Sequence, residues 1–478
     1  MTPAGYRALV TNLSAPEPPA GAAATMPAEA PGPAGRRRRF GWPVYAWGLW
    51  DWGSAAFNAV ITTFVFTVYL TSDAFGPGAD ATLGWVLAGA GFLIAVFAPV
   101  SGQRADRSGR RTLWLTVNTL LVVAASAGMF FVAPSPDYLW LGMLLLAVGN
   151  IFFEFASVNY NAMLNQIATP ATVGRVSGLG WGLGYIGGIV LLLIVYFGLI
   201  DPEVGMFGIT GEDGMDIRVA MLICAAWTLV FSLPVILTIR DPKGRRDRGE
   251  RTGLLASYRL LFRSIADLWR TDRNTVHFLL ASAVFRDGLA GVFTFGGVIA
   301  AGTFGFSAGQ VIIFGVAANL VAGVATILFG ALDDRIGPKR VIVLALACMV
   351  AAGTGVFVFH DAGRTAFWVL GLILCIFVGP AQSASRTFLA RLIPAGREGQ
   401  VFGLYATTGR AVSFLAPAAF SVFLGLGAAA TGLTGNDVQY WGILGIVLVL
   451  ALGLVLLLPV RPHSHRTDTP LDSRPAGL

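Results

Sequence analysis

Twelve long apolar segments divide this chain, and shorter loops, most of them with charged residues, separate them. Each segment is long enough to cross a bilayer, which takes about 20 apolar residues per helix. A soluble domain carries roughly 25% charged residues, whereas only 12% of this chain is charged, too little to cover a water-facing surface. The sequence therefore predicts an all-α membrane protein with about 12 transmembrane helices. The segments lie at approximately 44–71, 82–102, 112–132, 139–163, 175–199, 218–239, 275–300, 308–330, 340–359, 365–388, 399–427 and 438–459.

A charged sequence between the second and third segments returns between the eighth and ninth. GQRADRSGRR at 102–111 matches GALDDRIGPKR at 330–340 at a constant offset. Repeats of this kind are typical of membrane carriers, in which two similar halves enclose a site. We therefore expect two pseudo-symmetric six-helix bundles, at 40–239 and 275–460.

Both repeated sequences are predicted to be short hydrophilic turns. Their glycines permit a tight backbone, and Asp106 is placed to neutralise the start of the next helix. One interpretation is a plain basic loop. The repetition in register favours a second one, a conformational latch. Its residues would be Gly102, Asp106, Arg107, Arg111, Asp334, Arg335 and Lys339.

The loops alternate in charge along the chain. Arginine and lysine concentrate after even-numbered segments, whereas the loop near 200–217 is acidic. The positive-inside rule then puts both termini in the cytoplasm of a multi-pass plasma (inner) membrane protein. Residues 1–39 and 461–478 are predicted to be disordered cytoplasmic ends. Residues 240–274 are predicted to be a basic cytoplasmic linker with an amphipathic helix near Leu254–Trp269.

Several ionisable and amide side chains interrupt the apolar segments. Such groups are costly in a membrane and usually face a cavity or a partner. On the first and fourth segments they follow steps of three and four residues, which places them on one helix face. We expect the site for a solute or ion among Asp51, Asn58, Asn150, Glu154, Asn161, Arg286, Asp287, Gln382, Arg386 and Arg410.

Structural roles remain open for some of these residues. Asp51 could lie at the membrane surface. Arg286 and Asp287 are adjacent and could lock helices together, and the asparagines could bond across helices. The repeat also pairs Glu154 with Gln382 as equivalent positions in the two halves.

The sequence resembles a known family at several motifs. The two charged hairpins resemble the signature loop of the major facilitator superfamily. LWDWGSAAFNAVITTFVF at 49–66, the long motifs at 160–188 and 385–417, and FRDG at 285–288 resemble its vacuolar amino-acid effluxer-like branch, the unknown major facilitator family. Gly53, Arg286 and Arg410 depart from the family pattern. The resemblance carries over to Asp51, Glu154, Asn161, Asp287, Gln382 and Arg386.

This resemblance implies a secondary active transporter that works by alternating access. Its solute would be an amino acid or a related zwitterion or anion moved by efflux, with proton or sodium coupling. Export of amphipathic drugs is one alternative, and a non-transporting membrane sensor is another. No HExxH motif or phosphate-binding loop points to an enzyme. We expect membrane lipid around a monomer, with no cofactor, no metal and no nucleic-acid partner.

Overall fold

The structure is a computed structural model of the chain. It describes residues 40–76, 78–241, 259, 263, 266–270, 272–393, 396–432 and 435–462, with backbone alone at 80, 81, 308, 435 and 436. The predicted disorder at 1–39 and at 463–478 lies outside the described residues. So does most of the predicted amphipathic helix, although its described positions 259, 263 and 266–269 are helical.

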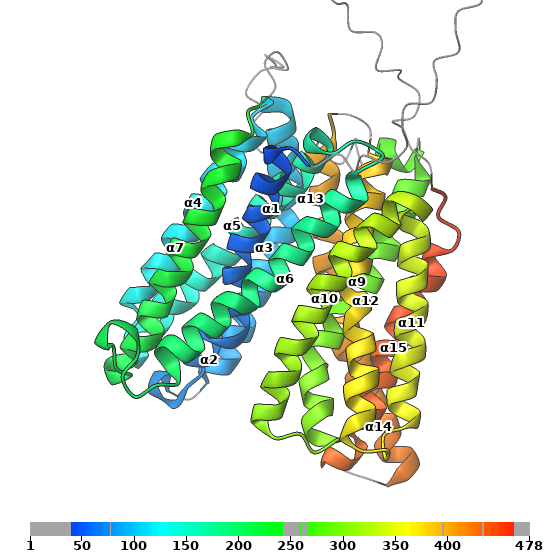
Figure 1. Cartoon of the computed structure of the whole chain (residues 1–478). Coiled ribbons are helices and arrows are strands. Elements are labelled where there is room, and N and C mark those ends of the chain that lie inside the picture. The colour runs from blue at the N-terminus through cyan, green and yellow to red at the C-terminus, as the bar shows by residue number, and fades with distance from the viewer. Residues whose placement is uncertain are drawn as a thin grey trace, which may run out of the picture. The chain divides into compact units, whose positions relative to one another are not determined.

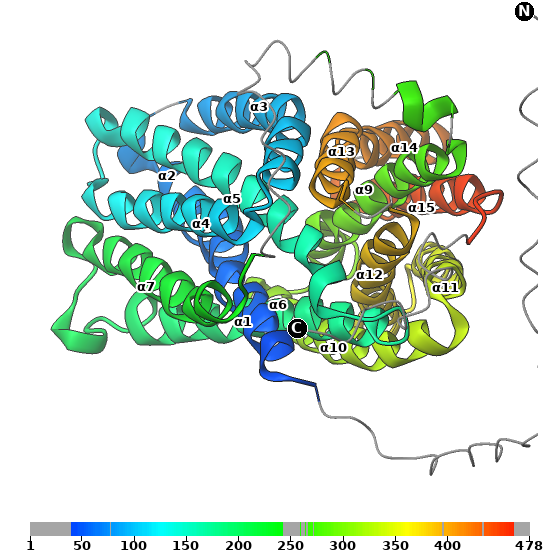
Figure 2. The same cartoon turned by 90° about the horizontal axis from the view of Figure 1, so that it is seen from above.

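Helices make up the membrane region in two groups (Figure 1). Figure 2 shows the two groups from above, side by side. The first group contains α1 (Trp42–Ala56), α2 (Phe66–Leu70), α3 (Ala79–Ser108), α4 (Arg111–Gly128), α5 (Leu139–Ile167), α6 (Val173–Val195) and α7 (Met215–Thr238). The second contains α9 (Arg273–Gly302), α10 (Ala308–Ile336), α11 (Pro338–Val358), α12 (Arg364–Leu392), α13 (Glu398–Ala411), α14 (Leu415–Thr431) and α15 (Gly442–Leu457).

Within the described ranges, 12 helical stretches are long and apolar enough to cross a membrane. Their bounds agree closely with the predicted segments, so the prediction of a twelve-span all-α membrane protein is confirmed. The agreement has a simple cause. A backbone in hydrocarbon must satisfy its own hydrogen bonds, and a continuous apolar run can do so only as a helix in a protein of this kind.

Two of the spans are interrupted. The first continues from α1 through a π-helix at Phe57–Phe64 before α2 begins. Within it the carbonyl oxygen of Asn58 accepts hydrogen bonds from the hydroxyls of Thr62 and Thr63, at 2.9 and 2.7 Å. These extra donors compete with the regular backbone ladder and favour a wider turn. The eleventh span breaks between α13 and α14, at 412–414.

The predicted turn at 102–111 is wrong over most of its length. Helix α3 continues to Ser108, and the chain reverses only at Gly109, whose φ of 60° ends the helix. A charged helix can leave the membrane without unwinding, because its backbone bonds are internal and its side chains reach water. Only Gly109 needs the left-handed conformation that glycine adopts without strain.

Gly102 has a different role from the one predicted. It lies inside α3, against the backbone of Gly399 on α13, and a Cβ atom at Gly102 would overlap the carbonyl group of Gly399. The second half repeats this contact, since a Cβ atom at Gly330 on α10 would lie 2.7 Å from the carbonyl oxygen of Gly174 on α6. Glycines thus let α3 approach α13, and α10 approach α6, across the boundary between the halves.

Gly102→Ala should lower the stability of the folded protein by about 1–3 kcal/mol, because the added methyl group forces α3 and α13 apart. Gly89→Ala is the matched control on the same helix, where nothing lies within 4 Å of the position that the methyl group would take. Thermal unfolding of the purified protein measures both. Equal midpoints for the two variants would contradict the tight contact.

Candidate functional site

The two halves are tied together at one end by carboxylates that bind helix N-termini. Asp106, in the last turns of α3, accepts hydrogen bonds from the backbone N–H groups of Gly399 and Gln400 on α13, each at 2.9 Å. Arg111 lies between two acids, with its Nη2 2.6 Å from Asp106 Oδ1 and 2.6 Å from Glu398 Oε2. Asp106 therefore caps a helix of the other half rather than the next helix along the chain.

The second half supplies the equivalent contact. Asp334 accepts hydrogen bonds from the N–H groups of Gly174 and Arg175 at the start of α6, at 2.7 and 3.1 Å, and from Arg175 Nε at 2.8 Å. Negative charge is stabilised at a helix N-terminus by the unpaired N–H groups and the helix dipole. The two contacts together bind each half to the first turn of a helix in the other.

The contact of Arg111 with two carboxylates is not repeated at its match in the second half. Lys339, the match of Arg111, donates to the backbone carbonyl of Leu458 at 2.7 Å. Arg107 and Arg335 occupy exposed positions near the ends of α3 and α10. The symmetry of the sequence repeat is therefore only partly reproduced in the contacts.

A buried network around Arg386 connects the halves one layer further in. Arg386 on α12 places Nη1 3.4 Å from Asp51 Oδ2 on α1 and donates to Asn161 Oδ1 on α5 at 3.2 Å. Its other nitrogens donate to the hydroxyl and the carbonyl oxygen of Ser177 on α6, at 2.9 and 2.6 Å. Tyr160 donates to the same Asp51 oxygen at 2.8 Å. The Arg386 side chain is only 4% exposed, and the Asp51 side chain is 18% exposed.

Aromatic rings complete the surroundings of Arg386. Its guanidinium carbon lies 4.9 Å from the ring centre of Trp47 and 5.6 Å from that of Trp181. A ring face attracts a cation, and more strongly where water is excluded. The positive charge is thus stabilised by one carboxylate, several oxygen acceptors and two indole rings.

Glu154 and Arg410 form a second charged pair between the halves, nearer the middle of the membrane. Arg410 Nη2 on α13 lies 3.3 Å from Glu154 Oε2 and 3.5 Å from Asn150 Oδ1 on α5. Glu154 lies next to the midpoint of the 29-residue helix α5, about 20 Å from its Ile167 end at 1.5 Å per residue. Arg410 is 36% exposed and therefore more accessible than Arg386, whereas Glu154 and Asp51 are each 18% exposed.

Arg286 and Asp287 contact neither of these pairs and instead tie α9 to the eleventh span. Asp287 accepts a hydrogen bond from the backbone N–H of Ala416 at 2.6 Å, at the start of α14. Arg286 donates to the carbonyl oxygen of Tyr405 at 3.1 Å, with its guanidinium carbon 3.8 Å from the Tyr405 ring centre. Both contacts agree with the structural alternative considered for these two residues.

Two predicted candidates lie outside the charged pairs. Asn58 is exposed on the π-helix, and Gln382 is half-buried on α12, one turn before Arg386. Conversely, sequence reasoning did not select Tyr160, Ser177 and Trp181, which surround Arg386. All three lie within the motif at 160–188, but hydroxyl and indole groups are too common in membrane helices to be selected from their type alone.

Comparison with known proteins points to one family. The sequence profile described as "Vacuole effluxer Atg22 like" matches residues 87–467. An uncharacterized MFS-type transporter of Bacillus subtilis, YxiO, is 25% identical over 90% of this chain and 97% of its own length. Autophagy-related protein 22 of Yarrowia lipolytica is 24% identical over 66% of this chain. The match covers 55% of that fungal protein, so the chain spans about half its length.

Solved structures agree on the fold. The human organic anion transporter MFSD10 aligns over 87% of this chain and 99% of its own, with a TM-score of 0.67 at 16% identity. The proton:xylose symporter XylE aligns over 86% of this chain and 94% of its own, with a TM-score of 0.66 at 12% identity. The predicted major facilitator fold with two six-helix bundles is confirmed.

Asp106→Ala should expose the first turn of α13 to hydrogen exchange, because the Gly399 and Gln400 amides lose their acceptor. Loss of a helix cap costs about 0.5–2 kcal/mol, so their protection should fall by roughly 2–30-fold. The start of α6 is the internal control, since Asp334 still accepts from Gly174 and Arg175. Asp334→Ala should give the reverse pattern, and mass spectrometry of exchanged peptides measures both. Unchanged exchange at 399–400 would contradict the assigned contact.

Proposed function

The chain belongs to the vacuole effluxer Atg22-like family, and from this premise we propose that it is a secondary active transporter for an amino acid or a related zwitterion or anion. Its relatives include an MFS-type transporter, and its fold is that of membrane carriers. General transport follows from the family and the fold. The class of solute is proposed from the charged pairs between the halves.

The observation that carries the proposal is the Glu154–Arg410 pair. Each half contributes one charge, at mid-depth, and Arg410 is the more exposed partner. A zwitterion offers the opposite arrangement, with a carboxylate for the guanidinium and an ammonium for the carboxylate. It can therefore replace both partners without leaving either charge unpaired in the membrane. An anion would engage Arg410 and require a proton on Glu154.

Breaking this pair links binding to movement of the halves. A ligand shifts a conformational equilibrium only if it interacts differently with the two states. Solute bound between Glu154 and Arg410 removes a tie that holds the halves in the present arrangement. Asp51 and Arg386 lie between this site and the tied end, where they act as the next barrier to the solute.

The carboxylate contacts of Asp106 and Asp334 act as the latch of this cycle. They close the end at which the basic loops lie, and by charge distribution this is the cytoplasmic end. Release of both carboxylates would open that end. The hydrogen-exchange experiment on Asp106 and Asp334 also tests whether these carboxylates act as a latch. If both helix starts stay protected when Asp106→Ala and Asp334→Ala are combined in one protein, the carboxylates do not hold the halves together.

Glu154→Gln should abolish transport driven by a pH gradient, with a fall of at least about tenfold in initial rate, because an amide cannot take up and release the proton. Exchange of labelled for unlabelled amino acid needs no net proton movement, so it should fall only by the lost contact between Glu154 and the ammonium group and remain measurable. Proteoliposomes loaded at two pH values provide the measurement. A pH dependence equal to that of the unaltered protein would remove Glu154 from coupling.

Arg410→Ala should weaken amino-acid transport by about tenfold or more, because a charge-assisted hydrogen bond to a carboxylate contributes about 1.5–3 kcal/mol. Arg364→Ala is the matched control, an exposed arginine at the opposite end of the second half. Uptake of a labelled amino acid and of a cationic amphipathic dye are measured in the same vesicles. Loss of dye transport alone would favour the drug exporter over the amino-acid carrier.

A further inference from the structure

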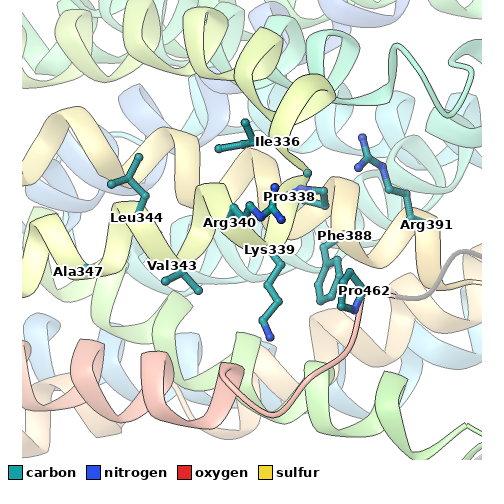
Figure 3. A pocket seen from close by; sticks show the side chains of 11 residues that line it. Ile336, Pro338, Lys339, Arg340, Val343, Leu344, Ala347, Phe388, Arg391 and Pro462 are labelled. Atoms are coloured by element: carbon teal, nitrogen blue, oxygen red, sulfur yellow. The ribbon is translucent and has the colours of Figure 1, made fainter.

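A hollow outside the charged pairs lies where α10 passes into α11. Its volume is about 800 Å³, and α12 and the segment that follows α15 close its sides (Figure 3). The lining residues are Ile336, Gly337, Pro338, Lys339, Arg340, Val343, Leu344, Ala347, Phe388, Arg391 and Pro462. None of them belongs to the Glu154–Arg410 or Asp51–Arg386 pairs.

The hollow has a basic end and an apolar wall. Lys339, Arg340 and Arg391 supply three cationic groups at the ends of α11 and α12. From there Val343, Leu344 and Ala347 continue along α11 into the span, and Leu344 is 42% exposed. A cationic end at the helix terminus and an apolar surface along the span match the order of headgroup and acyl chain in one leaflet.

The positive charge at the basic end is only partly neutralised by carboxylates within the described part of the chain. Lys339 donates to the backbone carbonyl of Leu458, and Arg340 is exposed. Arg391 lies 3.4 Å from Asp333 and 3.7 Å from Asp334, but Asp334 already accepts three hydrogen bonds from the start of α6. The buried Nε of Arg391 has no acceptor in the described part of the chain.

The first turn of α11 adds donors at the same place. Gly337, the residue before α11, has no side chain that could cap the helix. By contrast, the first turns of α6 and α13 are bound by Asp334 and Asp106. An uncapped helix start favours an anion through its N–H groups and dipole.

We propose that this hollow binds an anionic phospholipid of the surrounding leaflet. The phosphate lies among Lys339, Arg340 and the start of α11, and one acyl chain lies along Val343, Leu344 and Ala347. A free phosphate would satisfy the cations but leave the apolar wall uncovered, so a lipid fits both parts. Basic pockets between membrane helices are known to bind such headgroups.

The first half does not repeat this site. Arg111, at the position equivalent to Lys339, is buried against Asp106 and Glu398. The site is therefore specific to the second half, where it adjoins the carboxylate latch through Arg391. A bound lipid would hold the α10–α11 junction against α12 and stabilise the folded chain by mass action.

Native mass spectrometry of the purified full-length protein tests the proposal. Phosphatidylglycerol and phosphatidylcholine with identical acyl chains are titrated separately, and Kd is obtained for the first lipid bound. We expect phosphatidylglycerol to bind at least fivefold more tightly. Arg340→Gln should weaken phosphatidylglycerol binding at least fivefold by removing a headgroup contact. Val343→Trp should weaken it through the apolar wall, by filling the hollow.

Arg110→Gln is the matched control, because it removes an exposed cation from the equivalent junction between α3 and α4. It should leave the Kd unchanged. Equal affinity for the two lipids, or equal loss in Arg110→Gln and Arg340→Gln, would overturn the site. Full competition by millimolar glycerol phosphate would show a free-anion site instead of a lipid site. Arg340 is exposed, so its variant should fold, and because transport is not measured the result is independent of the proposed function.

Discussion

A charge inside a membrane must meet an opposite charge or a hydrogen-bond partner, and here several of the partners lie in the other half of the chain. Asp51 meets Arg386, and Glu154 meets Arg410. Each pair joins a helix of the first half to a helix of the second. Because an unpaired charge is costly in hydrocarbon, the relative position of the halves and the pairing of these charges depend on each other. A change in one requires a change in the other, which is the physical basis for a carrier.

The arginines of the two pairs differ in exposure, whereas Glu154 and Asp51 are each 18% exposed. Arg410 is 36% exposed, Arg386 is 4% exposed, and beyond them Asp106 and Asp334 bind helix starts. Asp106 and Asp334 accept hydrogen bonds from backbone N–H groups as well as from side chains. Each contact therefore forms only when the first turn of the partner helix lies against the carboxylate.

The contacts between the halves reproduce the sequence repeat where two helix backbones approach closely. They do not reproduce it where the contact is made by a single side chain. The close approach of Gly102 to Gly399 has its counterpart in Gly330 and Gly174, because both use the absence of a Cβ atom. Arg111 has no such counterpart. Its second partner is Glu398, whereas Lys339 turns to a carbonyl group near the chain end. Among the described residues, Arg111 is therefore bound to two carboxylates, whereas Lys339 lines the basic hollow of the second half.

The sequence by itself determined the twelve spans and their two-half arrangement, since apolar length and a repeated motif depend only on local composition and order. It also predicted Glu154, Arg386 and Arg410 within the spans, and Asp51 either within its span or at the membrane surface, because a charge in an apolar segment is visible in one dimension. Only the tertiary structure decided which of these charges meet, that Asp106 caps α13 rather than the next helix, and that Arg286 and Asp287 bind within their own half. The reason is physical: a pair or a cap depends on distance and direction between helices far apart in the chain, and helix periodicity gives the face of each residue but not the helix that faces it.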